Sequence, residues 1–187
     1  MKVEDMKLWQ HEMECPLGTL RLVSDGEALT RIWFPGEGRG RQKHATLPTR
    51  PDLPALAAAE NQLTEYFKGE RFEFDLPTAP GGTDFQNKVW AELRRIPAGT
   101  TTTYAKLAVQ VGNARACRAV GTANGANPLP ILVPCHRVIG SDGRLTGFAG
   151  GLEAKRWLLE HEAVALKKSP PGGRFSGDLF SNEYQAK

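Results

Sequence analysis

The chain has 187 residues, of which 40% are hydrophobic and 24% charged, a balance typical of a globular protein rather than a disordered or fibrous one. No stretch approaches the roughly 20 consecutive apolar residues that span a bilayer, and residues 1–10 do not form a signal peptide. We therefore expect no membrane association and a cytoplasmic location, or a nuclear one in a eukaryote. Three widely spaced cysteines without a CxxC pair argue against a disulfide framework and a zinc site, so we expect no metal and no cofactor.

The first third of the chain predicts a small antiparallel sheet with one helix. Alternating and β-branched side chains indicate short strands, with turns at Pro16-Leu17-Gly18 and Asp25-Gly26. Apolar residues on one face predict a helix over residues 54–68, followed by Gly69 where a C-cap is expected. The expected strands cover residues 7–13, 19–23, 29–34 and 72–76. Residues 35–54, rich in Gly, Pro and Arg, are expected to form a surface loop.

Beyond a Pro- and Gly-rich segment at residues 77–83, which we interpret as a linker, the hydrophobic period becomes helical. Thr83 and Gln86 form a capping-box pattern in front of an apolar stripe that stops at Pro97-Ala98-Gly99. Further helices are expected over residues 104–111, 114–125 and 152–164, and short strands over 131–133 and 144–148. The fold class is therefore α+β. It has an N-terminal domain with a small antiparallel sheet and a helix (1–76), a mainly helical C-terminal domain (84–166) and a disordered tail (167–187).

The two short helices joined by a turn at Gly112-Asn113 resemble a helix-turn-helix unit. The whole chain carries a net charge of only +3, yet residues 84–127 contain six basic and two acidic side chains. This surplus favours nucleic acid as a partner. Both features also have ordinary explanations: a solvated face, and a helical hairpin in a protein that does not bind DNA.

Cys135 is the strongest candidate for chemistry. It follows Pro134, which restricts the backbone, at the end of an apolar run. A packed core thiol is the ordinary alternative, because free cysteine is often buried. The neighbours favour a nucleophile instead, since His136 is adjacent and Glu162 lies in the last helix. A thiol with a pKa of about 8.5 needs a base at neutral pH, and a histidine oriented by a carboxylate is a general solution. Because adjacent side chains do not easily touch, we expect a water molecule to relay the proton.

Three sequence segments carry a close family resemblance. They are residues 127–131 (NPLPI), 134–140 (PCHRVIG) and 147–152 (GFAGGL). Together they resemble the active-site region of the O6-alkylguanine-DNA alkyltransferases, also called methylated-DNA-protein-cysteine methyltransferases, of the bacterial Ogt type. The resemblance runs without a gap from about residue 82 to residue 164, and the N-terminal part fits the variable first domain of this family more loosely.

The resemblance implies a role for each matching residue. Cys135 would accept the alkyl group, His136 would be the water-mediated base, Glu162 its orienting partner and Asn127 a hinge that ties the helix-turn-helix to the active-site segment. Tyr104 would help to rotate the nucleotide and contact the flipped base, and Arg118 would enter the duplex in its place. The remaining DNA contacts would come from Thr103, Ala119 and Gly121, and the guanine pocket would be lined near Val138, Phe148 and Ala149.

The implied partner is double-stranded DNA that contains O6-alkylguanine, with O4-alkylthymine as a possible second substrate. The reacting carbon lies inside the duplex, so a rigid thiol needs an extruded base. The helix after Arg118 is rich in small residues, which suit close approach to a minor groove without sequence readout. A thioether is stable and no second thiol is evident, so we expect one irreversible transfer per molecule. We expect a monomer, with cooperative binding along DNA left open.

Several relatives carry tyrosine and serine where this chain has Phe148 and Ala149, so backbone groups would have to serve in place of those hydroxyls. Two alternatives belong to other functional classes. A non-enzymatic binder of damaged DNA would lack the cysteine, whereas Cys135 is present. A cysteine hydrolase would process many substrates per molecule, whereas an alkyltransferase stops after one equivalent.

Overall fold

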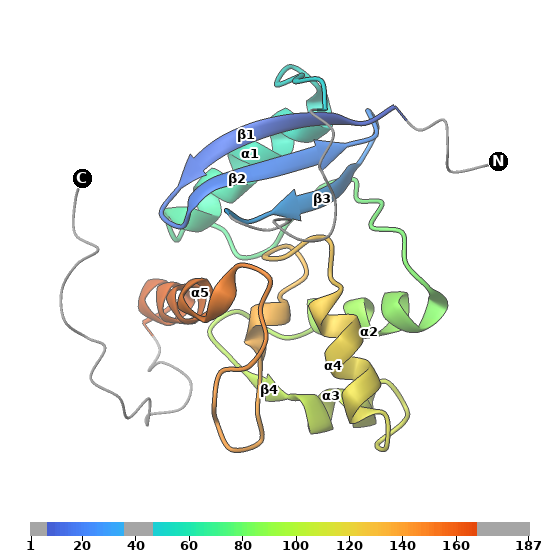
Figure 1. Cartoon of the computed structure of the whole chain (residues 1–187). Helices are drawn as coiled ribbons and strands as arrows, with labels where there is room; N and C mark the ends of the chain where they lie inside the picture. The colour runs from blue at the N-terminus through green and yellow to red at the C-terminus, as the bar shows by residue number, and fades with distance from the viewer. Residues whose placement is uncertain (1–6, 36–46, 168–187) are drawn as a thin grey trace.

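The computed structural model describes residues 7–35 and 47–167 of the chain (Figure 1). A three-stranded sheet with one helix forms the upper part of the molecule in Figure 1, and the remaining helices form the lower part. This arrangement confirms the predicted α+β class. Most of the expected 35–54 loop and nearly all of the expected C-terminal tail lie outside the described residues. Within the described ranges, no helix has the length and apolar character needed to cross a membrane.

The sheet is antiparallel in the order β1-β2-β3. Its strands are β1 (Trp9–Cys15), β2 (Gly18–Ser24) and β3 (Leu29–Trp33). The β1–β2 hairpin closes tightly because Cys15 pairs with Gly18, whose φ of +96° favours glycine. As a result, β1 begins and ends two residues later than the strand expected over residues 7–13.

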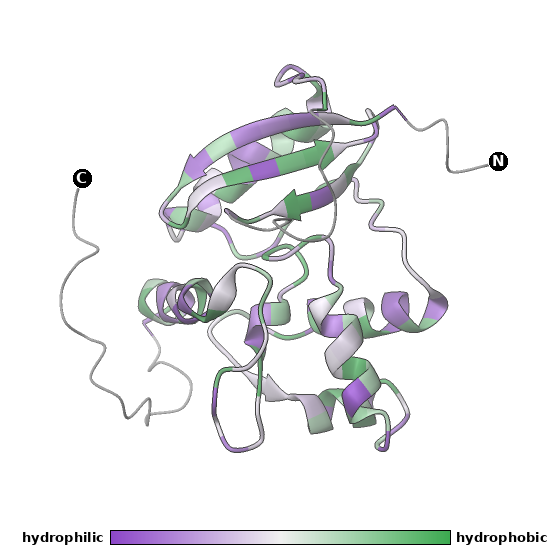
Figure 2. Ribbon diagram, viewed as in Figure 1, coloured by the Kyte–Doolittle hydropathy of each residue, from purple (hydrophilic) through white to green (hydrophobic). Residues whose placement is uncertain are grey.

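Helix α1 (Pro54–Phe67) packs on the sheet, and its buried residues include Leu56, Leu63 and Tyr66. Figure 2 shows the corresponding alternation of apolar and polar residues along β2. The apolar side chains on one face of β2 and on one face of α1 therefore form a single apolar layer between the sheet and the helix.

The lower part of the molecule begins with α2 (Asp84–Arg94). The predicted capping box is confirmed: the Thr83 hydroxyl accepts from Gln86 N, and the Gln86 side chain accepts from Thr83 N. The predicted helix-turn-helix is formed by α3 (Tyr104–Gln110) and α4 (Cys117–Gly125), and the last helix is α5 (Gly151–Ala165). Two short parallel strands, β4 (Thr102–Thr103) and β5 (Val138–Ile139), lie between these helices.

Three expected strands are wrong. Residues 72–76 run as extended chain without a strand partner, and residues 144–148 belong to a long loop after β5. Residues 131–133 form a turn, because Ile131 adopts a φ of +76° and Val133 N donates to Leu129 O at 2.8 Å. Only residues 131–133 are buried, whereas the apolar side chains of the other two segments are half-buried, and none of the three segments pairs in a ladder among the described residues.

Backbone hydrogen bonds join the two parts of the molecule along β3. Leu29 bonds in both directions to the start of the predicted linker, with Leu29 N donating to Pro77 O at 2.9 Å and Ala79 N donating to Leu29 O at 3.0 Å. Ile32 N donates to Pro128 O at 2.8 Å, in the loop that leads to Cys135. The sheet is therefore bonded directly to the active-site loop, whereas the division of the chain at residues 77–83 stays a prediction.

Candidate active site

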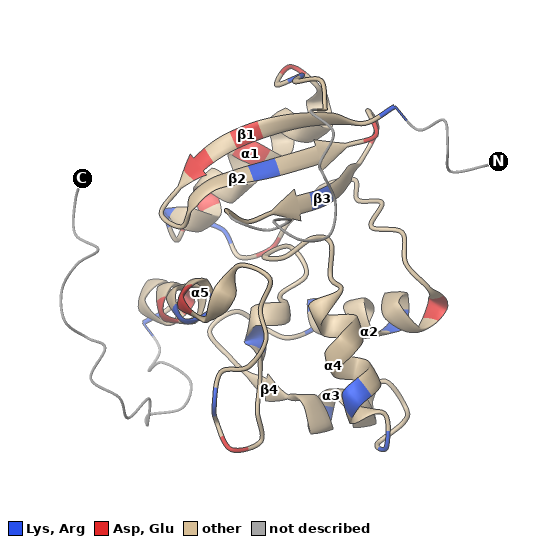
Figure 3. Ribbon diagram, viewed as in Figure 1, with Lys and Arg blue, Asp and Glu red and all other residues tan. Residues whose placement is uncertain are grey.

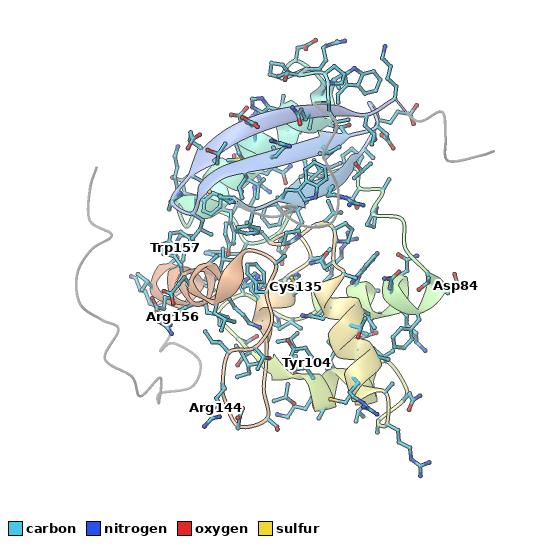
Figure 4. All side chains as sticks on the ribbon, viewed as in Figure 1. Asp84, Tyr104, Cys135, Arg144, Arg156 and Trp157 are labelled. Atoms are coloured by element: carbon cyan, nitrogen blue, oxygen red, sulfur yellow. The ribbon has the colours of Figure 1, made fainter. Side chains whose placement is uncertain are left out.

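Cys135 begins η2 (Cys135–Arg137), a single 3-10 turn directly before β5. Its side chain is 4% exposed, and its backbone N donates to Val133 O at 2.7 Å. Figure 4 shows Cys135 in the middle of the molecule, between α5 and the helical region. The turn before it and the strand after it leave the cysteine little freedom to move.

Asn127 holds the loop in front of Cys135 closed. Its amide donates to Val133 O at 2.7 Å, while its side-chain oxygen accepts from Leu129 N at 3.0 Å. Both bonds are buried, and together they hold the loop in its closed conformation. The turn forces Ile131 into a left-handed conformation that β-branched residues rarely adopt. The strained residue lies two positions before Val133, whose carbonyl accepts from Cys135 N.

Glu162 in α5 accepts hydrogen bonds from four different residues. Oε1 accepts from His136 Nε2 at 2.8 Å, from an Arg137 terminal nitrogen at 2.7 Å and from the Tyr66 hydroxyl at 3.0 Å. Oε2 accepts from Gly99 N and Arg137 Nε, both at 3.0 Å. Burial favours the neutral acid, but the bonds from His136 and Arg137 outweigh it and hold the pKa of Glu162 well below its usual range. The carboxylate is therefore charged and firmly held.

His136 is fully buried next to Cys135 in η2. Because an ionised carboxylate can only accept, Nε2 of His136 carries the proton that it donates to Glu162. Nδ1 is then an acceptor, and it is buried with no hydrogen-bond partner among the described residues. Burial is the largest influence on the pKa of His136 and lowers it, although Glu162 acts in the opposite direction. The geometry yields a neutral histidine with a free basic nitrogen.

Lys155 in α5 is a second buried cation near the cysteine. Its ammonium donates to Val138 O at 2.7 Å and to Thr146 O at 2.6 Å, so it ties β5 to the loop after it. Burial lowers the pKa of Lys155 to about 8, against an opposing influence from the Cys135 thiolate. The attraction is mutual, so the Lys155 charge favours ionisation of Cys135.

The loop after β5 contacts His136 through Phe148. The Phe148 ring packs edge-on against two other rings. Its centroid lies 6.4 Å from that of His136 and 5.2 Å from that of Phe34. Across from it, the Tyr104 hydroxyl lies 3.4 Å from Thr146 O, at the limit of a hydrogen bond. Burial raises the pKa of Tyr104, which keeps its proton at neutral pH. Val138 is buried behind the cysteine, whereas Ala149 is exposed.

The expected DNA-contacting residues lie on the helix-turn-helix, away from the sheet. Arg118 and Ala119 are exposed in the first turn of α4, and the half-buried Gly121 faces the Tyr104 ring. The Thr103 hydroxyl caps α3 by accepting from Lys106 N at 3.2 Å. In Figure 3 the basic residues of this region lie at the lower end of α4 and the loop before it. Arg115, Arg118 and Lys106 have no carboxylate partner among the ion pairs of the described residues.

Sequence reasoning did not assign roles to Tyr66, Phe34, Arg137 and Lys155. Tyr66 and Phe34 come from the N-terminal part, and no spacing in the sequence indicates their contacts. Lys155 left a signal: with Leu158, Leu159 and Glu162 it follows a helical i, i+3, i+4, i+7 pattern, so two charged residues occupy the buried face of α5. Charged residues in an apolar stripe indicate a functional or paired site.

Comparisons with known proteins cover nearly all of the described chain. A family model described as "6-O-methylguanine DNA methyltransferase, ribonuclease-like domain" matches residues 9–80, and one described as "6-O-methylguanine DNA methyltransferase, DNA binding domain" matches residues 84–164. The constitutive methylated-DNA–protein-cysteine methyltransferase of Bacillus subtilis is 46% identical over 157 residues, which is 83% of this chain and 95% of that protein. The Salmonella typhimurium protein of this name is 43% identical over 169 residues, with shares of 86% and 99%.

Comparison with solved structures identifies the same family. The crystal structure of Mycobacterium tuberculosis OGT in complex with DNA superposes with a TM-score of 0.77 at 42% identity and covers 84% of this chain and 94% of that one. A buried cysteine beside a carboxylate-anchored histidine is the arrangement of an enzyme with a cysteine nucleophile. The chain belongs to the 6-O-methylguanine DNA methyltransferase family. Its enzyme class is therefore transfer of a methyl group from methylated DNA to a cysteine of the protein.

Proposed function

We propose that the chain repairs O6-alkylguanine in double-stranded DNA by moving the alkyl group to its own Cys135, once per molecule and irreversibly. The observation that carries this proposal is the free, buried Nδ1 of His136, next to Cys135 and opposite a nitrogen that is bonded to Glu162. A cysteine activated in this way, in a member of this family, is the natural acceptor.

In the proposed reaction, the Cys135 thiol loses its proton through a water molecule to His136 Nδ1. The sulfur then attacks the alkyl carbon, so that a carbon–sulfur bond forms while the bond from carbon to O6 breaks. The electron pair of that bond leaves with the guanine oxygen. Glu162 stabilises the imidazolium, and Lys155 favours the thiolate. A thioether is chemically stable, which is why we expect a single turnover.

The target base must leave the duplex, since the sulfur is buried and fixed to a short 3-10 turn. We propose that α4 lies in the minor groove, where Arg118 enters the stack and Tyr104 contacts the extruded base. The complex of the M. tuberculosis relative with DNA supports DNA as the partner. The base would then lie near Val138, Phe148 and the backbone of Ala149.

Repair of O4-alkylthymine is a property to be measured with a duplex that carries this base. We propose that the protein acts as a monomer in the cytoplasm, or in the nucleus of a eukaryote, with cooperative binding along DNA as a property to be measured.

The decisive experiment mixes the protein with a duplex oligonucleotide carrying O6-methylguanine and weighs the intact protein and its tryptic peptides. We expect one methyl group per molecule, on the peptide that contains Cys135, and none in Cys135→Ser. Cys15 is an internal control, because burial raises its pKa to about 11 and leaves it a weak nucleophile. Methylation of another peptide, or repeated turnover, would refute the proposal.

The role of Arg118 needs a comparison of two substrates. Arg118→Ala should slow repair of the duplex at least tenfold while leaving the reaction with free O6-benzylguanine nearly unchanged, since only the duplex requires base extrusion. Arg115→Ala is the matched control, because it removes an equally exposed positive charge just before α4. Equal losses with both substrates, or equal effects of both substitutions, would contradict the assignment.

A further inference from the structure

Tyr66 is a residue of the sheet domain that reaches the centre of the active site. It lies in the last turn of α1, is fully buried, and its ring packs edge-on against Phe67, Phe72 and His161. Its hydroxyl donates to Glu162 Oε1 at 3.0 Å. Because the aromatic cluster fixes the ring, the hydroxyl has one available partner and one orientation.

We propose that Tyr66 is a positioning residue for the reaction of Cys135. Its hydroxyl donates to the same Glu162 oxygen that anchors His136, and this keeps His136 neutral and ready to accept a proton. This inference rests on the proposed function, because it assigns Tyr66 a part in activating the same cysteine. It also makes the N-terminal domain a component of the active site rather than a separate scaffold.

Three donors compete for a single carboxylate oxygen. Oε1 of Glu162 accepts from His136, Arg137 and Tyr66 at once. Each donor withdraws negative charge from the oxygen, so each weakens the pull of the others. Without the Tyr66 hydroxyl, the carboxylate would attract the His136 Nε2 proton more strongly and favour the imidazolium form, which cannot accept a proton from Cys135.

The other groups around His136 do not remove this effect. Arg137 in η2 and Lys155 in α5 are cations that lower the pKa of His136, and both stay in place when Tyr66 is altered. Arg137 and Gly99 N also continue to hold Glu162. The Tyr66 hydroxyl therefore changes the electrostatics of the carboxylate without being its main mechanical support.

The test is Tyr66→Phe in the full chain, which keeps the ring and removes only the hydroxyl. The rate of reaction with free O6-benzylguanine is measured against pH. We expect the acidic limb of the profile to move to higher pH by about 0.5–1 unit. The lost hydrogen bond to the charged Glu162 is of the size that shifts the protonation of His136 by this amount. The rate on the alkaline plateau should stay within about twofold of wild type.

A second measurement follows the His136 imidazole by NMR in the unreacted protein, where the same upward shift in pKa is expected. Trp157→Phe is the control: Trp157 stacks on His161 at 4.8 Å in the same aromatic cluster but makes no polar contact with Glu162. A purely structural role would lower the rate at every pH equally and leave both midpoints in place.

An unmoved limb and unmoved NMR midpoint in Tyr66→Phe, or an equal shift in Trp157→Phe, would overturn the inference. Failure of Tyr66→Phe to fold would do so as well, since the hydroxyl would then be a structural bond. If the wild-type protein itself acquired no alkyl group on Cys135, the proposed function would fail instead, so the two failures are distinguishable.

Discussion

Replacing Glu162 by Gln tests the buried charge cluster most directly. The amide has nearly the shape of the carboxylate, but it carries no charge, and one of its two polar atoms is a donor. It would face the guanidinium of Arg137, the Nε2–H of His136 and the N–H of Gly99, all of which donate to Glu162 in the native structure. Arg137, whose side chain is only 5% exposed, would be left as a buried cation without a counter-ion.

The magnitude follows from that unpaired cation. Removing one partner of a buried ion pair costs about 3–5 kcal/mol of the free energy of unfolding. With a urea m-value of about 2 kcal/mol/M, the midpoint of unfolding should fall by about 1.5–2.5 M. A domain of this size has roughly 5–15 kcal/mol of stability, so the variant should still fold in water unless the wild type lies at the lower end of that range.

Urea unfolding followed by circular dichroism measures this change at neutral pH. Glu153→Gln is the matched control, because Glu153 lies in the first turn of the same helix with its side chain 85% exposed. Its loss should cost less than about 0.5 kcal/mol. Similar changes for the two variants would refute the view that Glu162 balances a buried cation.

The pH dependence gives a second check on the same residue. In the unfolded chain Glu162 takes up a proton near pH 4.3, whereas the folded state holds its pKa well below that value. The stabilisation is therefore complete above about pH 4.3 and is lost as the pH falls below it. Glutamine does not titrate, so the stability gap between wild type and Glu162→Gln should narrow from pH 5 to pH 3. A gap that is constant or grows on acidification would contradict this reasoning.

Three further substitutions have defined outcomes. Ile131→Gly should be less destabilising than Ile131→Ala in urea unfolding, by about 1 kcal/mol, because only glycine adopts the positive φ without strain. Asn127→Ala should cost about 1–3 kcal/mol and slow the reaction of Cys135 with free O6-benzylguanine, and Asn127→Asp should not restore the rate, since it cannot donate to Val133 O. Thr83→Ala should cost about 1 kcal/mol by loss of the capping box while leaving that reaction rate unchanged, and a slower reaction would show that α2 also sets the active-site geometry.

The features that local sequence patterns predicted well are those with local causes. The Thr83 capping box, the hairpin turns and the amphipathic faces of α1 and α2 depend on residues within a few positions of each other. The resemblance around Cys135 likewise concerns a continuous segment. For these elements, the forces that form the structure act between neighbours in the chain.

The errors have the opposite cause. Residues 72–76 alternate like a strand, but they pair with no strand among the described residues, and Phe72 and Phe74 pack against Tyr66 instead. Residues 131–133 look like a buried strand, yet the two hydrogen bonds of Asn127 close them into a turn. The periodicity of apolar residues indicates which side chains are buried, but it does not indicate which other elements they pack against.

The sequence alone determined the fold class, the pairing of a cysteine with an adjacent histidine and the candidate carboxylate. Only the tertiary structure decided how that carboxylate is held: Glu162 lies 96 positions from Tyr66 and 63 from Gly99, and both donate to it. The physical reason is that a buried charge must gather donors from every element that packs around it. Such a set follows from the packing of domains and leaves no spacing that can be recognised along the chain.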